Sequence, residues 1–203
     1  RRYSPMLTIG GGTVLDNLPR KHRPGESKTI ELLRRLEGAT LKDRVALLTA
    51  ASGSSGADEV YLQHRTFSST THLRSVANSL ADAGRLAIAQ EMPLVVLDSQ
   101  VVNTLEETIV EAVCRQHTEH PLMPGLSKSA VAATLPRHLP EVILDVLLDR
   151  LITAQRLGVS SNTLALPEHN VTLSEPQKRI RATLLATYEE AGWSPPSIDN
   201  AWK

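Results

Sequence analysis

Apolar residues recur at helical spacing along most of this chain. In residues 104–119, Leu105 and Ile109 fall on one stripe, while Glu106 falls mostly on the other side. Pro121 must end this segment, because the residue before a proline is pushed out of the helical conformation. The pattern therefore predicts an amphipathic helix. The same reasoning predicts helices over residues 27–38, 41–53, 57–64, 70–83, 127–135, 140–154 and 174–191.

Two predicted hairpins follow groups of these helices. Residues 85–90 and 94–98 are predicted to be strands around a turn, and residues 157–160 and 163–166 form a second, shorter pair. Three helices followed by a hairpin is the order of a winged helix. The predicted fold class is therefore mostly α with small β-hairpins (α+β), arranged as tandem winged helices.

The two hairpins belong to an internal repeat with an offset of 71 residues. Residues 80–88 and residues 151–159 share a helix end and the strand that follows it. The matching pairs are Leu73 and Leu144, Val76 and Leu147, Leu80 and Leu151, Ala83 and Ala154, Arg85 and Arg156, Leu86 and Leu157, and Ile88 and Val159.

The repeat divides the chain into four predicted parts. Residues 1–24 are predicted to be the last strands of an upstream β-domain with a basic linker, and residues 25–99 the first winged-helix unit. Residues 100–169 are the predicted second unit, and residues 170–203 the first helix of a third, truncated unit.

The first part differs from the rest. Residues 6–9 and 13–16 are strand candidates on either side of Gly10-Gly11-Gly12. A phosphate-binding loop is the competing interpretation, but no Lys-Ser or Lys-Thr follows the glycines and no helix pattern begins there. Two strands cannot form a stable sheet alone, so we expect them to complete a β-barrel domain that lies upstream. Residues 52–56 are predicted to be a flexible break.

Residues 120–128, which we call the elbow, separate two predicted helices. Leu122, Met123 and Leu126 are too apolar for a solvated loop, so we expect them to fill the core beneath both helices. Ser127 can cap the second helix. A Leu122→Asp substitution is then expected to destabilise the protein by roughly 2 kcal/mol or more.

Composition narrows the function classes. Of 203 residues, 41% are hydrophobic and only 3% aromatic, so the cores must consist of Leu, Val, Ile and Ala. The formal net charge is zero, so any nucleic-acid contact must come from a local patch. No segment is apolar enough to span a membrane or to act as a signal peptide. The single cysteine, Cys114, excludes an internal disulfide and fits a reducing, cytoplasmic compartment. Because the chain lacks an initiating Met, we expect it to be a piece of a longer protein.

Candidate chemistry is sparse. Cys114, His117 and His120 have helical spacing, but no fourth metal ligand is suggested, and a core cysteine is the alternative. Adjacent carboxylates such as Glu106 and Glu107 diverge on a helix instead of converging on a substrate. We therefore predict no catalytic residue, no metal site and no enzyme activity for this chain.

Few basic residues are placed to contact nucleic acid. The third helix of the second unit carries Glu141, Asp145 and Asp149 on one face, with only Arg150 nearby, and that row would repel phosphates. The same helix of the first unit is polar, which is compatible with weak backbone contact but favours a solvated face, because a single Arg neutralises few phosphates. The RNA-contact candidates are Arg20, Lys21, Arg23, Arg74, Lys128 and Arg137.

Three motifs stand in order around the repeat. They are Tyr3-Ser4-Pro5 with residues 8–16 and 19–23, then the elbow, then residues 190–196. In this order they resemble the end of the third β-domain, the winged-helix elbow and the start of the next unit in the bacterial selenocysteine-specific translation elongation factors.

The resemblance implies a role in translation. That family delivers selenocysteinyl-tRNA to the ribosome at UGA codons, with a GTPase domain, β-domains and a row of winged helices whose last members grip an mRNA hairpin. It implies that this chain is a monomeric spacer and transmitter between two RNA sites. GTP and Mg²⁺ would bind the upstream part of the parent protein, because no phosphate-loop motif occurs here.

Two other classes stay open. A tandem winged-helix DNA-binding transcription regulator would show sequence-specific duplex binding, and a protein-interaction scaffold would bind basic proteins through its acidic faces.

Overall fold

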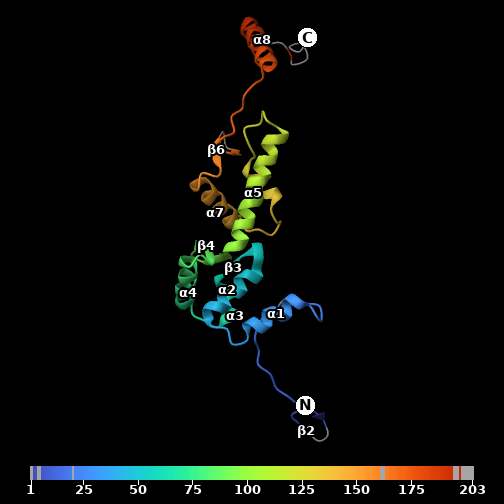
Figure 1. Ribbon diagram of the computed structural model, residues 1–203, viewed down its shortest axis with the longest axis vertical. Helices are drawn as coiled ribbons and strands as arrows, with labels where there is room; N and C mark the ends of the chain where they lie inside the picture. Colours follow the sequence, from blue (N-terminus) through green and yellow to red (C-terminus); the bar gives the residue numbers. More distant parts are fainter. Residues whose placement is uncertain (1, 4–5, 20, 161–162, 194–196, 198–203) are drawn as a thin grey trace.

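The computed structural model describes residues 2–3, 6–19, 21–160, 163–193 and 197. The chain is mostly helical with small antiparallel sheets, which confirms the predicted fold class. Its elements follow one another along a single long axis (Figure 1). Within the described residues, none of the helices combines the length and the apolarity that crossing a membrane requires.

The first unit, which we define as α2 through β5, has the winged-helix order. Its three-stranded sheet runs β3-β5-β4, all antiparallel. A further helix, α1 (Ser27–Leu36), precedes it. The elements are α2 (Leu41–Ser52), the 3-10 turn η1 (Gly53–Ser55), β3 (Ala57–Asp58), α3 (Glu59–Thr66), α4 (Thr70–Asp82), β4 (Leu86–Glu91) and β5 (Leu94–Asp98).

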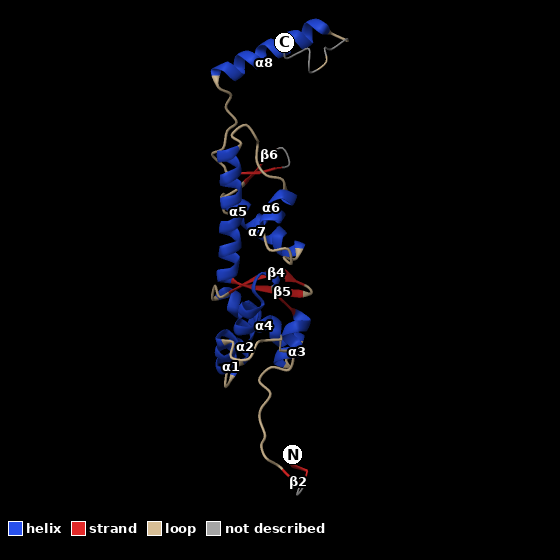
Figure 2. Cartoon of the chain, turned by 90° about the vertical axis from the view of Figure 1, so that its right-hand side faces the viewer, coloured by secondary structure: helices blue, strands red, loops and turns tan. Residues whose placement is uncertain are grey.

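The second unit, α5 through β7, repeats this order. Here Leu126 alone takes the place of the first strand, in an antiparallel bridge to Leu164 of β7. The elements are α5 (Ser99–Glu119), α6 (Lys128–Thr134), α7 (Glu141–Thr153), β6 (Gly158–Ser160) and β7 (Thr163–Ala165). An extended segment then leads to α8 (Glu175–Ala191), which lies beyond the second unit in both views (Figures 1 and 2).

Helix starts are set by side chains that accept hydrogen bonds from free backbone amides. Thr40 accepts from the amide of Asp43 at 3.2 Å, and Asp58 accepts from that of Tyr61 at 2.7 Å. Ser127 accepts from the amide of Ala130, as its position in the elbow predicts. Helix α1 begins at Ser27, as predicted, but the preceding residue, Glu26, makes no side-chain capping hydrogen bond.

The internal repeat has a structural basis at the junction between the third helix and the wing. Gly84 has a φ of 68° and Gln155 a φ of 55°, so both units turn through the left-handed conformation at the same repeat position. The next residue then donates its amide back to the helix: Arg85 to Leu80 and Arg156 to Leu151, each at 2.9 Å. The repeat thus conserves a helix stop as well as apolar positions.

The β4–β5 hairpin separates two apolar cores and contributes to both. Alternate side chains of a strand point to opposite faces. Leu94 and Val96 are buried against α2 and α4 in the first core. Leu97 and Ala89, on the other face, are buried in the second core with helices α5 and α7. Among the described residues every buried hydrophobic side chain is Leu, Val, Ile or Ala, as the composition requires.

Several local predictions were wrong. Residues 13–16 form no strand; instead β2 (Met6–Leu7) pairs with β1 (Arg2–Tyr3). The predicted helix over residues 57–64 begins with strand β3, so helix α3 starts only at Glu59 and runs to Thr66.

Two further boundaries also differ from expectation. The predicted flexible break over residues 52–56 contains η1, which packs against α5. Helix α5 starts at Ser99 instead of residue 104, because Asp98 caps it directly after β5. The proposed domain boundaries at residues 24, 99 and 169 stay predictions, as does the upstream β-barrel.

The elbow packs differently from the prediction. Leu122 is 46% exposed and Met123 is 51% exposed, so neither fills the core. Leu126 is partly buried against the second core, as expected. Gly125 is buried, and a Cβ there would lie 2.3 Å from the carbonyl oxygen of Leu164. The elbow therefore acts through backbone pairing, which needs a glycine beside the wing.

A Gly125→Ala substitution should lower the free energy of unfolding by roughly 2 kcal/mol or more, because the added methyl must displace β7. Leu122→Asp is the matched control and should change it by less than about 1 kcal/mol, since Leu122 already meets water. Urea unfolding followed by circular dichroism measures both. A larger loss for Leu122→Asp would show that the elbow is buried.

Candidate functional site

The surfaces by which winged helices reach nucleic acid are the third helix and the wing. In the first unit the wing is the β4–β5 hairpin, and both of its faces are covered by the two cores. The loop after α6 also contacts the first unit, where His138 Nε2 and Ser54 Oγ lie 3.0 Å apart. The faces of this wing are therefore packed between the units.

On α7, the predicted acidic row is partly neutralised from within the unit. Lys128 Nζ lies 3.2 Å from Glu141 Oε1 and 2.5 Å from Asp145 Oδ1. These hydrogen bonds, to Asp145 first and Glu141 second, raise the pKa of Lys128 above its ordinary value. Lys128 thus joins α6 to α7, and its ammonium group is already paired with carboxylates.

Two other cations of the second unit, Arg150 and Arg156, meet at one carboxylate. Glu106, predicted to lie on the polar side of α5, is buried. Arg150 Nε donates to its Oε1 at 2.7 Å, and Arg156 Nη1 lies 3.6 Å from its Oε2. Arg150, the cation beside the acidic row, is therefore turned toward α5.

Arg74, the candidate on α4, is also paired. Its Nη2 lies 3.1 Å from Glu59 Oε2, which in addition accepts the backbone amide of Leu94 at 3.2 Å. The bond from Leu94, together with those from Arg74 and Thr70, lowers the pKa of Glu59 below its ordinary value. Arg74 therefore joins α4, α3 and the wing.

The remaining candidates are not brought together. Lys21 and Arg23 lie exposed in the linker before α1, and Arg137 lies exposed in the loop after α6. Arg20 lies outside the described residues. The structure gathers none of these around a common groove, so their role in RNA contact stays a prediction.

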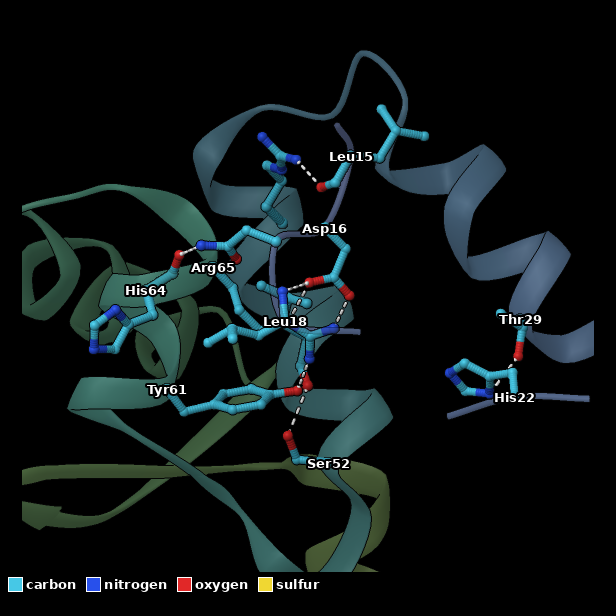
Figure 3. A network of polar contacts seen from close by, with 12 residues as sticks. Leu15, Asp16, Leu18, His22, Thr29, Ser52, Tyr61, His64 and Arg65 are labelled. Atoms are coloured by element: carbon cyan, nitrogen blue, oxygen red, sulfur yellow. Dashed lines mark hydrogen bonds and ion pairs between the residues drawn. The ribbon is translucent and has the colours of Figure 1, made fainter. Parts of the chain in front are cut away.

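The sequence analysis did not predict one polar cluster, which consists of Asp16, Tyr61 and Arg65 (Figure 3). Arg65 of α3 makes a two-point contact with Asp16 of the linker: Nε donates to Oδ1 at 2.8 Å and Nη2 to Oδ2. Its Nη1 donates to the hydroxyl of Tyr61, and the guanidinium lies over the Tyr61 ring, 4.8 Å from the centroid. Only 5% of the Arg65 side chain and 7% of the Asp16 side chain are exposed. No periodic pattern marks such a pair, because Asp16 lies outside any helix or strand.

At the far end of the second unit, two imidazoles stack. The rings of His117 and His169 are 3.6 Å apart and within 8° of parallel, beside a pocket of about 520 Å³ that Cys114 and Glu168 also line. His169 Nε2 donates to the carbonyl oxygen of Met123 at 3.0 Å. Burial, and then the neighbouring His169, lower the pKa of His117. Within the described residues, no three His, Cys, Asp or Glu side chains are grouped to hold a metal ion.

Comparison with known proteins finds similar sequences. Residues 111–166, from α5 through the second wing, match the family model described as elongation factor SelB, winged helix. The selenocysteine-specific elongation factor of Desulfomicrobium baculatum is 25% identical over 197 residues, which are 97% of this chain and 31% of that protein. The chain thus spans about a third of the length of the relative it matches. Both findings confirm the resemblance seen in the motifs.

Acid should destabilise the folded chain at the stack of His117 on His169. The folded pKa of His117 lies below the unfolded value of 6.5, so below pH 6.5 the unfolded chain binds more protons than the folded chain. Stability is then retained above pH 6.5 and is progressively lost as the pH falls below it. Melting temperatures measured between pH 8 and pH 5 test this.

A His117→Phe variant, which keeps a flat ring in the stack, should lose much of that pH dependence. The exposed His120→Gln variant is the control and should keep it. Identical pH profiles for the wild type and His117→Phe would contradict the assignment.

Proposed function

We propose that this chain is the winged-helix portion of a selenocysteine-specific translation elongation factor, because residues 111–166 match the winged-helix family model of elongation factor SelB. In this role it is a spacer and transmitter between a tRNA-binding, GTP-hydrolysing part and an mRNA-hairpin-binding end. The parent protein would act in the cytoplasm on the ribosome, with GTP and Mg²⁺ bound outside this chain.

The pairing of its cations supports the spacer role. Affinity for nucleic acid grows with the number of phosphates that free Lys and Arg side chains neutralise. Arg74, Lys128 and Arg150 are all paired with carboxylates of their own unit. The third helices therefore offer structural ion pairs where a nucleic-acid reader needs free cations. This is the observation that carries the proposal.

The packing of the first wing supports the transmitter role. A hairpin that is buried on both faces holds its neighbours at a fixed angle, because any rotation would uncover Leu97 on one side or Val96 on the other. A displacement at one end of the two units would then be carried to the other.

The same two observations weigh against a DNA-binding regulator, which needs an accessible wing and a basic third helix. A dimer in solution that binds a specific duplex would favour that alternative. A scaffold for basic proteins would instead be favoured if the chain captured protein and no RNA.

This chain alone should show no tight, specific binding to a selenocysteine-insertion mRNA hairpin in a gel-shift assay at about 0.15 M salt. A scrambled hairpin serves as the control. Tight, specific binding would contradict the spacer assignment.

A Glu141→Gln, Asp145→Asn double variant frees Lys128 and removes two acids from α7. It should gain only weak affinity, equal for both hairpins and abolished by added salt. A gain in affinity that is specific for the true hairpin would show that the surface of α7 around Lys128 recognises RNA.

A further inference from the structure

The linker that leads into the first unit does not run free. Residues 15–18, which we call the strap, lie along the first unit, and three of them, Leu15, Asp16 and Asn17, make hydrogen bonds to it (Figure 3). Arg44 Nη2 donates to the carbonyl oxygen of Leu15 at 2.6 Å, and Asn17 Nδ2 donates to that of His64 at 2.6 Å. Between them, Asp16 receives the two-point contact from Arg65. The strap is therefore attached to both α2 and α3.

The residues before the strap make little contact. Ideal Cβ atoms built on Gly10, Gly11 and Gly12 would meet nothing within 4 Å. Val14 is 75% exposed. Three consecutive glycines also have more conformational freedom than any other tripeptide. A flexible segment therefore ends where the strap begins.

The strap is attached mainly by polar contacts. Leu15 is only partly buried and Leu18 is more than half exposed, so its release would uncover little apolar surface. Release would return the Asp16 carboxylate and the Arg65 guanidinium to water, where both are well solvated. Burial also lowers the pKa of Arg65, which reflects the cost of keeping this cation out of water. An attachment of this kind can open while the first unit stays folded.

We propose that Asp16 and Arg65 form a latch that sets the length of the free tether between the N-terminal β1–β2 hairpin and the first unit. With the latch closed, the free tether is residues 8–14, which span at most about 25 Å. With the latch open, it extends at least to residue 19 and spans up to about 40 Å. The latch deepens the proposed transmitter role, on which its functional meaning rests, because a short tether passes on displacements that a long one absorbs.

Spin-label distance measurements between Cys114, which is exposed, and a Leu18→Cys label in the strap, where the side chain is 54% exposed, test the latch. The parent chain should give one narrow distance distribution. Asp16→Asn, which removes the charge but keeps the shape, should broaden it at least about twofold. The exposed Asp82→Asn is the matched control and should leave it narrow.

Hydrogen exchange separates a latch from a structural ion pair. In Asp16→Asn the amide of Leu18, which donates to Asp16 Oδ1, should exchange about tenfold faster, while the amides of α4 keep their rates. Arg65→Gln, which removes the other partner of the contact, should likewise speed exchange at Leu18 and leave the rates of the α4 amides unchanged. Faster exchange throughout α4 in both variants, or a narrow distribution in both, would overturn the proposal. No RNA is present in either measurement, so a failure of the latch is distinguishable from a failure of the spacer role.

Discussion

The burial of the β4–β5 hairpin on both faces is the constraint on which the rest of the structure depends. A two-stranded hairpin is marginal alone, and this one gains its stability from two helical layers. Since β5 continues into α5 with only Asp98 as the cap, the second unit begins where the hairpin ends. The two units are therefore joined by packing and by a direct continuation of the chain, with no linker between them.

In these packed units charged side chains of the helices form ion pairs within the protein. A helix that contacts phosphates must leave its cations unpaired, whereas a helix that holds a domain together can use them against its own carboxylates. Glu59 and Glu106 are each largely buried and each receives an arginine, from Arg74 and Arg150. A chain with equal numbers of acids and bases can satisfy such pairs internally. The zero net charge of the sequence therefore agrees with the structure, in which arginines pair with carboxylates of the same chain.

Much of the fold could be predicted from sequence because helices and wings leave periodic patterns. The apolar stripe of α5, the repeat at Leu80 and Leu151, and the Ser127 cap all depend on neighbours within a few residues. Contacts outside this range were missed. Leu126 pairs with Leu164 through a single bridge, too short for any alternation to appear. Leu122 was misassigned because hydrophobicity alone does not give the side on which a loop side chain lies.

The candidate site was less predictable, for a related reason. Basic residues can be counted in a sequence, but whether each is free or paired depends on distant partners, as with Arg65 and Asp16 in the linker. Two of these polar contacts lie at the ends of the packed body: the Asp16–Arg65 pair where the chain enters it, and the His117–His169 stack where it leaves. In the middle, the Arg74–Glu59 and Arg150–Glu106 pairs stand beside two apolar cores, so opening there would uncover large side chains as well as charges. At the Asp16–Arg65 pair, little apolar surface accompanies the polar contact. The cost of opening therefore depends on how much apolar packing accompanies each polar contact.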